Sequence, residues 1–155
     1  MHHTRRSVLK GVWAIGALAT AAAAGLLGPV RAFAAWNKGA FEAKSTLDAM
    51  RALGVANAED TKAIEIRAPD IAENGAVVPI DITSNIPGTT AISVFIEKNP
   101  FPYTGTFDFS QGSMPYVHLR VKMGESSPVR VVVAAGGKFY TAAKEVKVTI
   151  GGCGG

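Results

Sequence analysis

The chain has 155 residues, of which 48% are hydrophobic and 18% charged, and its formal net charge is +4. That length is sufficient for one domain with a hydrophobic core. Four of the 16 Lys and Arg residues lie in the first 34 positions, which contain no Asp or Glu, so the remaining chain carries 12 charges of each sign. This balance excludes a basic patch for nucleic acid and electrostatic docking on a membrane.

Residues 1–34 have the pattern of a cleaved twin-arginine export signal. Residues 4–10 contain paired arginines, an aliphatic residue and a lysine, and an uncharged Ala- and Gly-rich run then leads to an A-x-A cleavage pattern at residues 32–34. The run is long enough to span a membrane, so an uncleaved anchor is the alternative. We expect a mature chain that starts at Ala35 and is exported, already folded, to the periplasm. The single cysteine, Cys153, has no partner there for an internal disulfide.

The next domain, residues 35–150, should begin with a helix over residues 40–53. Asn37 is suited to cap its start, and Gly54 supplies a stop. One apolar stripe repeats at intervals of three and four residues: Ala40, Ala43, Leu47 and Met50.

From Ala63 onward the apolar residues alternate with polar ones, which predicts strands with one face to bury and one that can meet water or a partner. The apolar sets are Val78/Ile80/Ile82, Ile92/Val94/Ile96, Val117/Leu119/Val121/Met123, Val129/Val131/Val133 and Val146/Val148/Ile150. Turn residues separate them at Asn74-Gly75, at Pro87-Gly88 and at Gly136-Gly137. The predicted fold is therefore all-β, an immunoglobulin-like antiparallel β-sandwich with an N-terminal helix.

Little in this domain suggests an ordinary active site. His118 shares a polar strand face with Arg120 and Lys122, so we interpret it as a solvated or partner-facing side chain. One histidine and one cysteine do not make a zinc site, and neither a phosphate loop nor an acid–base pair of carboxylates is recognisable. We therefore predict no catalytic residue, no metal and no cofactor. The proline-rich aromatic loop at residues 97–103 is interpreted as structural, with a partner contact as the alternative.

The last five residues are Gly151, Gly152, Cys153, Gly154 and Gly155. Because glycine has no side chain to pack, we predict a flexible arm on which Cys153 is the covalent attachment point for substrate. A free cysteine has a pKa near 8.5, only its thiolate attacks, and the tail contains no group that would favour the thiolate. Activation must therefore come from the site that the arm visits, which is typical of a carrier rather than an enzyme.

Other interpretations of Cys153 remain open at this point. The cysteine could be incidental, or it could link two copies by a disulfide, which is compatible with a carrier. A self-contained periplasmic thiol peroxidase or disulfide oxidoreductase would need a resolving cysteine or a nearby base. A C-terminal thiocarboxylate on Gly155 would need ATP-dependent adenylation, and a binding module that uses only its sandwich surface would not need the thiol.

The sequence resembles the SoxY family, the sulfur-carrier subunits of bacterial thiosulfate oxidation, over nearly its whole length. The resemblance rests on the twin-arginine segment, on residues 40–53, and on the segments 70–75, 97–100, 122–127 and 144–155. It implies that Cys153 holds thiosulfate-derived sulfur while partner enzymes act on it, and that the chain needs no cofactor of its own.

The resemblance also implies specific partners. SoxZ, a second β-sandwich subunit, would form a heterodimer with this chain and, if it lacks a signal of its own, would be exported bound to it. A c-type cytochrome pair would couple thiosulfate to Cys153, a dinuclear-metal hydrolase would release sulfate, and a molybdenum/haem dehydrogenase would oxidise the remaining sulfane sulfur. No nucleic acid is expected as a partner, and no membrane once the signal has been cleaved.

Overall fold

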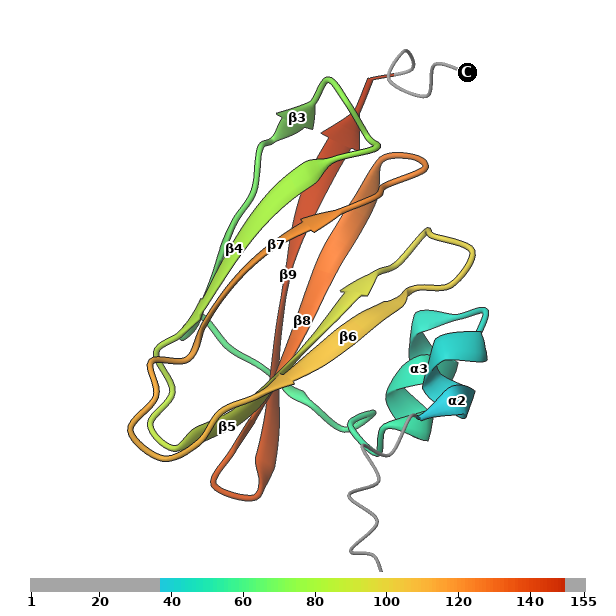
Figure 1. The fold of residues 1–155 in the computed structure, drawn as a ribbon. Helices are drawn as coiled ribbons and strands as arrows, with labels where there is room; N and C mark the ends of the chain where they lie inside the picture. The colour runs from blue at the N-terminus through green and yellow to red at the C-terminus, as the bar shows by residue number, and fades with distance from the viewer. Residues whose placement is uncertain (1–36, 150–155) are drawn as a thin grey trace, which may run out of the picture. The chain divides into compact units, whose positions relative to one another are not determined.

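The computed structural model describes residues 37–149, which form two short helices and two β-sheets (Figure 1). The helices are α2 (Lys38–Glu42) and α3 (Thr46–Ala52). The strands are β1 (Glu59–Asp60), β2 (Ile64–Arg67), β3 (Ile71–Ala72), β4 (Val78–Ser84), β5 (Thr89–Ile96), β6 (Tyr103–Asp108), β7 (Tyr116–Val121), β8 (Ser127–Ala135) and β9 (Lys138–Val148).

The strands form a larger sheet of order β1-β9-β8-β5-β6, with β3 also paired to β9, and a smaller sheet of order β2-β4-β7. The prediction of an immunoglobulin-like sandwich is confirmed, with one correction to its topology. Within residues 37–149 the pairings are antiparallel except that β1 and β3 run parallel to β9. These two strands have two residues each, too short for an alternating pattern to reveal them.

The core between the two sheets is built from the alternating aliphatic residues. Fully buried side chains from both sheets meet there: Val78, Ile80 and Ile82 of β4, and Ile92, Val94, Ile96, Val129, Val131 and Val133 of β5 and β8. Because side chains on a strand point alternately to opposite faces, each set fills one side of its sheet.

The opposite face of β5 was predicted to meet water or a partner, and that prediction is wrong. Phe95 is completely buried there and Ser93 is 6% exposed. A second apolar cluster covers this face, in which helices α2 and α3 contribute Ala40, Ala49 and Met50. The larger sheet is therefore buried on both sides along residues 92–96 of β5.

The single helix predicted over residues 40–53 is also wrong, since the chain forms two helices with a break at residues 43–45. Asn37 does cap the first, accepting a hydrogen bond from the Ala40 amide at 3.0 Å. Ser45 caps the second: its Oγ accepts from the Asp48 amide at 3.1 Å and donates to the Asp48 carboxylate at 2.7 Å. A serine followed three residues later by a carboxylate is a helix-start signal inside the predicted helix.

The predicted turns occupy their expected places. Gly88 has φ +71°, as the second central residue of a type II turn requires after Pro87. Gly136 and Gly137 have φ +57° and +76°, which suits the tight hairpin between β8 and β9.

Candidate functional site

The residues predicted to carry substrate, Cys153 and its glycine neighbours, lie outside the described residues, as do the export signal and Ile150. The description ends at Thr149, four positions before Cys153. The described residues nearest to Cys153 in the sequence are those at the end of β9. We call residues 147–149 the arm root.

The arm root extends beyond the pairing between β8 and β9, which stops at Ser127 opposite Val146. On one side, the Lys147 amide donates to the carbonyl of Asp70, just before β3, at 3.0 Å, and the Thr149 amide donates to the carbonyl of Ala72 in β3 at 3.1 Å. On the other side, the Val148 amide donates to the Ser126 hydroxyl at 2.9 Å. Successive amides of a strand point to opposite sides, so the Ser126 side chain takes the place that a neighbouring strand's carbonyl would have.

Gly75 allows three chain segments to approach one another at the arm root. A Cβ atom at this position would lie 2.5 Å from the carbonyl oxygen of Met123 and 2.8 Å from a methyl group of Val148. The Met123 amide donates to the Gly75 carbonyl at 2.7 Å. The turn itself depends on Asn74, whose Oδ1 accepts from the Ala76 amide at 2.9 Å. Gly75 is thus required for space, whereas Asn74 shapes the reversal.

The loop at residues 97–103 supports the loop that carries Ser126. The Asn99 side chain donates to the Lys122 carbonyl at 2.7 Å and accepts from the Gly124 amide at 3.2 Å. The Lys98 amide donates to the Ser127 hydroxyl at 3.0 Å. These contacts agree with the structural interpretation of residues 97–99.

Four segments that are distant in the sequence therefore meet at one end of the sandwich, where β9 ends (Figure 1). They are residues 70–75, 97–99, 122–127 and 144–149, joined by the hydrogen bonds given above. The sequence resemblance rested on the same stretches of chain, with no indication that they are neighbours. Together, these contacts hold residues 147–149 in place.

A second polar cluster lies on the outer face of the smaller sheet, around Asp81. His118 stands directly opposite Asp81 across the β4–β7 pair, with its Nδ1 2.9 Å from the Asp81 carboxylate. Tyr116 donates its hydroxyl hydrogen bond to the same carboxylate oxygen. The hydrogen bonds from Tyr116 and His118 lower the pKa of Asp81, and the bond to Asp81 raises the pKa of Tyr116.

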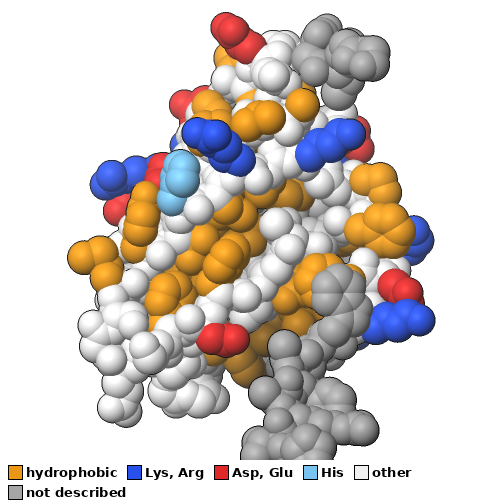
Figure 2. Space-filling model, in the orientation of Figure 1, with side chains coloured by type: hydrophobic (Ala, Val, Ile, Leu, Met, Phe, Trp, Pro, Cys, Tyr) orange, Lys and Arg blue, Asp and Glu red, His pale blue; other side chains and the backbone are white. Residues whose placement is uncertain are grey.

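The exposed position predicted for His118 is observed, since 49% of its side chain is exposed. Sequence reasoning missed Asp81 and Tyr116 as its neighbours, because only the strand register brings these residues together. Figure 2 shows basic and acidic side chains interspersed with hydrophobic ones on one face of the molecule, in agreement with the balanced charge outside the signal.

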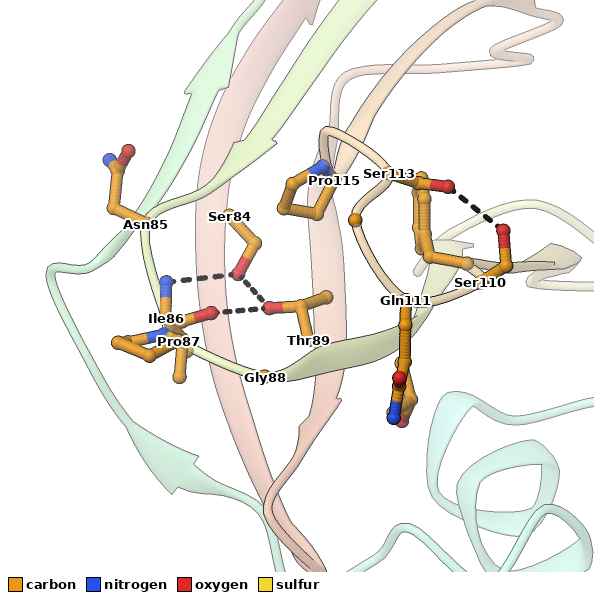
Figure 3. Close-up of a pocket in the computed structure, with 13 residues that line it drawn as sticks. Ser84, Asn85, Ile86, Pro87, Gly88, Thr89, Ser110, Gln111, Ser113 and Pro115 are labelled. Carbon is orange, nitrogen blue, oxygen red and sulfur yellow. Dashed lines mark hydrogen bonds between the residues drawn. The ribbon is translucent and has the colours of Figure 1, made fainter.

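A hollow of about 530 Å³ lies between the β4–β5 and β6–β7 loops, lined by residues 84–90 and 109–113 and by Pro115 (Figure 3). Four of its hydroxyl groups bond in pairs: the Ser84 and Thr89 oxygens lie 2.7 Å apart, and the Ser110 and Ser113 oxygens lie 3.0 Å apart.

No group of three or more His, Cys, Asp or Glu side chains within residues 37–149 is arranged to hold a metal ion. In the same part of the chain, neither helix has the length and apolarity needed to cross a membrane.

Comparisons with known proteins identify the family. The family model described as "Sulfur oxidation protein SoxY" matches residues 49–153. The solved structure of the sulfur carrier protein SoxY from Chlorobium limicola f thiosulfatophilum is 44% identical, with a TM-score of 0.60 over 67% of this chain and 96% of that one. A superoxide reductase (neelaredoxin) from Ignicoccus hospitalis, 18% identical with a TM-score of 0.50 over 56% of this chain and 80% of its own, shares the fold alone. No curated protein sequence matches. The chain therefore belongs to the SoxY family of sulfur oxidation proteins.

Proposed function

We propose that this chain is a periplasmic sulfur carrier of thiosulfate oxidation, which holds sulfur intermediates covalently on Cys153. The observation that carries the proposal is the extent of the family match, which runs to residue 153 and so includes the only cysteine of the chain. The solved relative of 44% identity is itself named a sulfur carrier protein.

The chemistry of a thiol suits this cargo. In the loading step the Cys153 sulfur bonds to the outer sulfur of thiosulfate, giving Cys–S–S–SO₃⁻, with one proton released and two electrons passed to a cytochrome partner. Water then cleaves the bond between the sulfane sulfur and the sulfonate, which leaves sulfate and a persulfide on the cysteine. Sulfur–sulfur bonds of this kind are readily made and exchanged by thiolates.

The arm root supports a model in which the sandwich stays in place while the sulfur on Cys153 moves between partner enzymes. The amides of residues 147–149, at the end of β9, are held alternately from the two sides, by the β3 segment and by Ser126. Cys153 follows four residues later, which gives it a reach of about 13–14 Å from Thr149 when extended. A partner enzyme can therefore draw the cysteine into its own active site while the sandwich stays outside.

The partners and the location belong to the same proposal. The chain forms a heterodimer with a SoxZ subunit and is exported, folded, through the twin-arginine route. The cytochrome pair, the sulfate-releasing hydrolase and the sulfane dehydrogenase each act in turn on the cargo. The chain contributes the attachment point and has no turnover of its own.

The test is the intact mass of the protein isolated from the periplasm of thiosulfate-grown cells. We expect a mature chain starting near Ala35, with sulfur-containing adducts that a reductant removes. Cys153→Ser should carry none of these adducts. Reducible adducts that persist in this variant would refute the assignment of Cys153.

A self-contained thiol enzyme would behave differently in a second assay. The purified protein, with no partner present, should fail to turn over hydrogen peroxide or a disulfide substrate. Sustained turnover by the protein alone, lost in Cys153→Ser, would replace the carrier proposal with a peroxidase or oxidoreductase.

A further inference from the structure

We propose that Ser126, together with residues 70–73, is a positioning element that sets the point from which Cys153 reaches its partner enzymes. This inference rests on the proposed carrier function and assigns a role to residues away from the cysteine. It follows from the contacts that hold the arm root after β9 has separated from β8.

Ser126 supplies hydrogen bonds that no backbone partner supplies at this position. Its half-buried hydroxyl accepts from the Val148 amide at 2.9 Å and lies 3.4 Å from the Val148 carbonyl, to which it donates. A buried or half-buried backbone group without a partner is costly, so loss of this hydroxyl favours opening of the strand end. The Ser126 loop is in turn fixed by Asn99, through Lys122 and Gly124.

The other side of the arm root is held by the residues around β3. In addition to the two backbone bonds from Lys147 and Thr149, the Thr149 hydroxyl donates to the Glu73 carbonyl at 3.4 Å. The Lys144 ammonium holds the start of the β3 segment. It lies 3.1 Å from the Asp70 carboxylate and donates to the Ala68 carbonyl at 2.8 Å. The two sides together hold residues 147–149 in one place.

The consequence for the cargo is a matter of tether length. With the arm root closed, Cys153 lies four positions after the last held residue, Thr149. With the arm root open, it lies seven positions after Val146, the last residue of β9 paired with β8. The effective concentration of a tethered group falls roughly as the −3/2 power of tether length once the tether can span the gap, so opening the root lowers it about two-fold. The effective concentration of Cys153 falls by the same factor at the active site of every partner enzyme.

The test compares Ser126→Ala with Ser126→Thr, which keeps a hydroxyl, and with Ser113→Ala, which removes an exposed hydroxyl from the loop hollow. A nitroxide attached to Cys153 of the full mature protein broadens the amide signals of residues it approaches. In the wild type we expect this broadening on residues 70–76 and 122–126. In Ser126→Ala it should extend to more residues, and the Val148 amide should exchange with solvent faster.

The second readout is loading of thiosulfate onto Cys153 by the cytochrome partner in the heterodimer. Ser126→Ala should lower kcat/KM by up to about two-fold, the value for a fully open arm root, with recovery in Ser126→Thr and no change in Ser113→Ala. Alkylation of the thiol by free iodoacetamide should stay unchanged in all variants. An unaltered nitroxide pattern in Ser126→Ala overturns the inference, and so does an unaltered kcat/KM when Val148 exchange has increased. The proposed function fails separately, if wild type carries no adduct on Cys153.

Discussion

Gly75→Ala is the substitution for which the structure gives the sharpest expectation. The backbone of Gly75 is not in the left-handed region, so alanine has no conformational penalty there. The added methyl group would instead lie 2.5 Å from the Met123 carbonyl oxygen and 2.8 Å from Val148. A backbone atom cannot be displaced as cheaply as the end of a side chain, so residues 75 and 123 must separate.

The magnitude follows from two contributions. Forcing one extra carbon into a well-packed site costs about 1–3 kcal/mol. Separating the two segments weakens the bond from the Met123 amide to the Gly75 carbonyl, which contributes about 0.5–1.5 kcal/mol. We therefore expect the free energy of unfolding to fall by about 2–4 kcal/mol, a large share of the roughly 5–15 kcal/mol that stabilises a typical domain.

Urea unfolding of the mature protein measures this loss. For a slope of about 2 kcal/mol per molar urea, the midpoint should fall by about 1–2 M. Gly124→Ala is the matched control, because this glycine lies in the same region, has no atom within 4 Å of an added Cβ and does not have a positive φ. Its stability should change by less than about 1 kcal/mol. Equal urea midpoints for the two variants would show that the close approach of Met123 and Val148 to Gly75 does not limit stability.

Three further substitutions test other parts of the structure. Asp81→Asn should return the raised pKa of Tyr116 toward its ordinary value, seen by ultraviolet absorbance titration. Because folding lowers the pKa of Asp81, its carboxylate stabilises the folded state fully above the unfolded pKa of about 4. This stabilisation is lost as the pH falls through the lower pKa of the folded state. In Asp81→Asn the free energy of unfolding should therefore depend less on pH in the acid range. Ser45→Ala removes a helix cap and should cost about 0.5–2 kcal/mol in urea unfolding; no loss would mean that the cap is dispensable. Phe95→Ala empties a completely buried site and should cost about 3–5 kcal/mol in the same assay, and a cost below 1 kcal/mol would contradict the second cluster.

The sandwich was predictable because its strands follow a simple physical rule. A strand with one buried face must place apolar residues at every second position, as Val78, Ile80 and Ile82 do, and glycine at Gly88 and Gly136 gives the φ values that the turns need. β1 and β3 were missed because two residues cannot show a period. Phe95 was assigned to an exposed face because alternation along one strand says nothing of a helix pair that covers the sheet from outside.

The site was predictable only in part, for a related reason. Cys153 stands out by composition, because one cysteine between glycines needs no tertiary information, and its role stays a prediction here. Ser126 and Gly75 carry no such signal: an ordinary serine in a loop and a glycine after an asparagine have many local explanations. Their importance depends on Val148, which is distant from Gly75 in the sequence and reaches it only in the folded chain. The same holds for Asp81, which meets His118 through strand register.

The position of β9 in the larger sheet has a consequence for the order of folding. This strand lies between β1 and β8, yet it is the last strand in the described part of the chain, and the hydrogen bonds from Lys144 and Thr149 join residues 76 positions apart. Pairing between residues so distant in the sequence is intrinsically slow. Until they form, β1 and β3 have no partner strand, so the sheet is incomplete for as long as the segment that precedes Cys153 is unplaced. The segment that precedes Cys153 is thus also the one that completes the larger sheet.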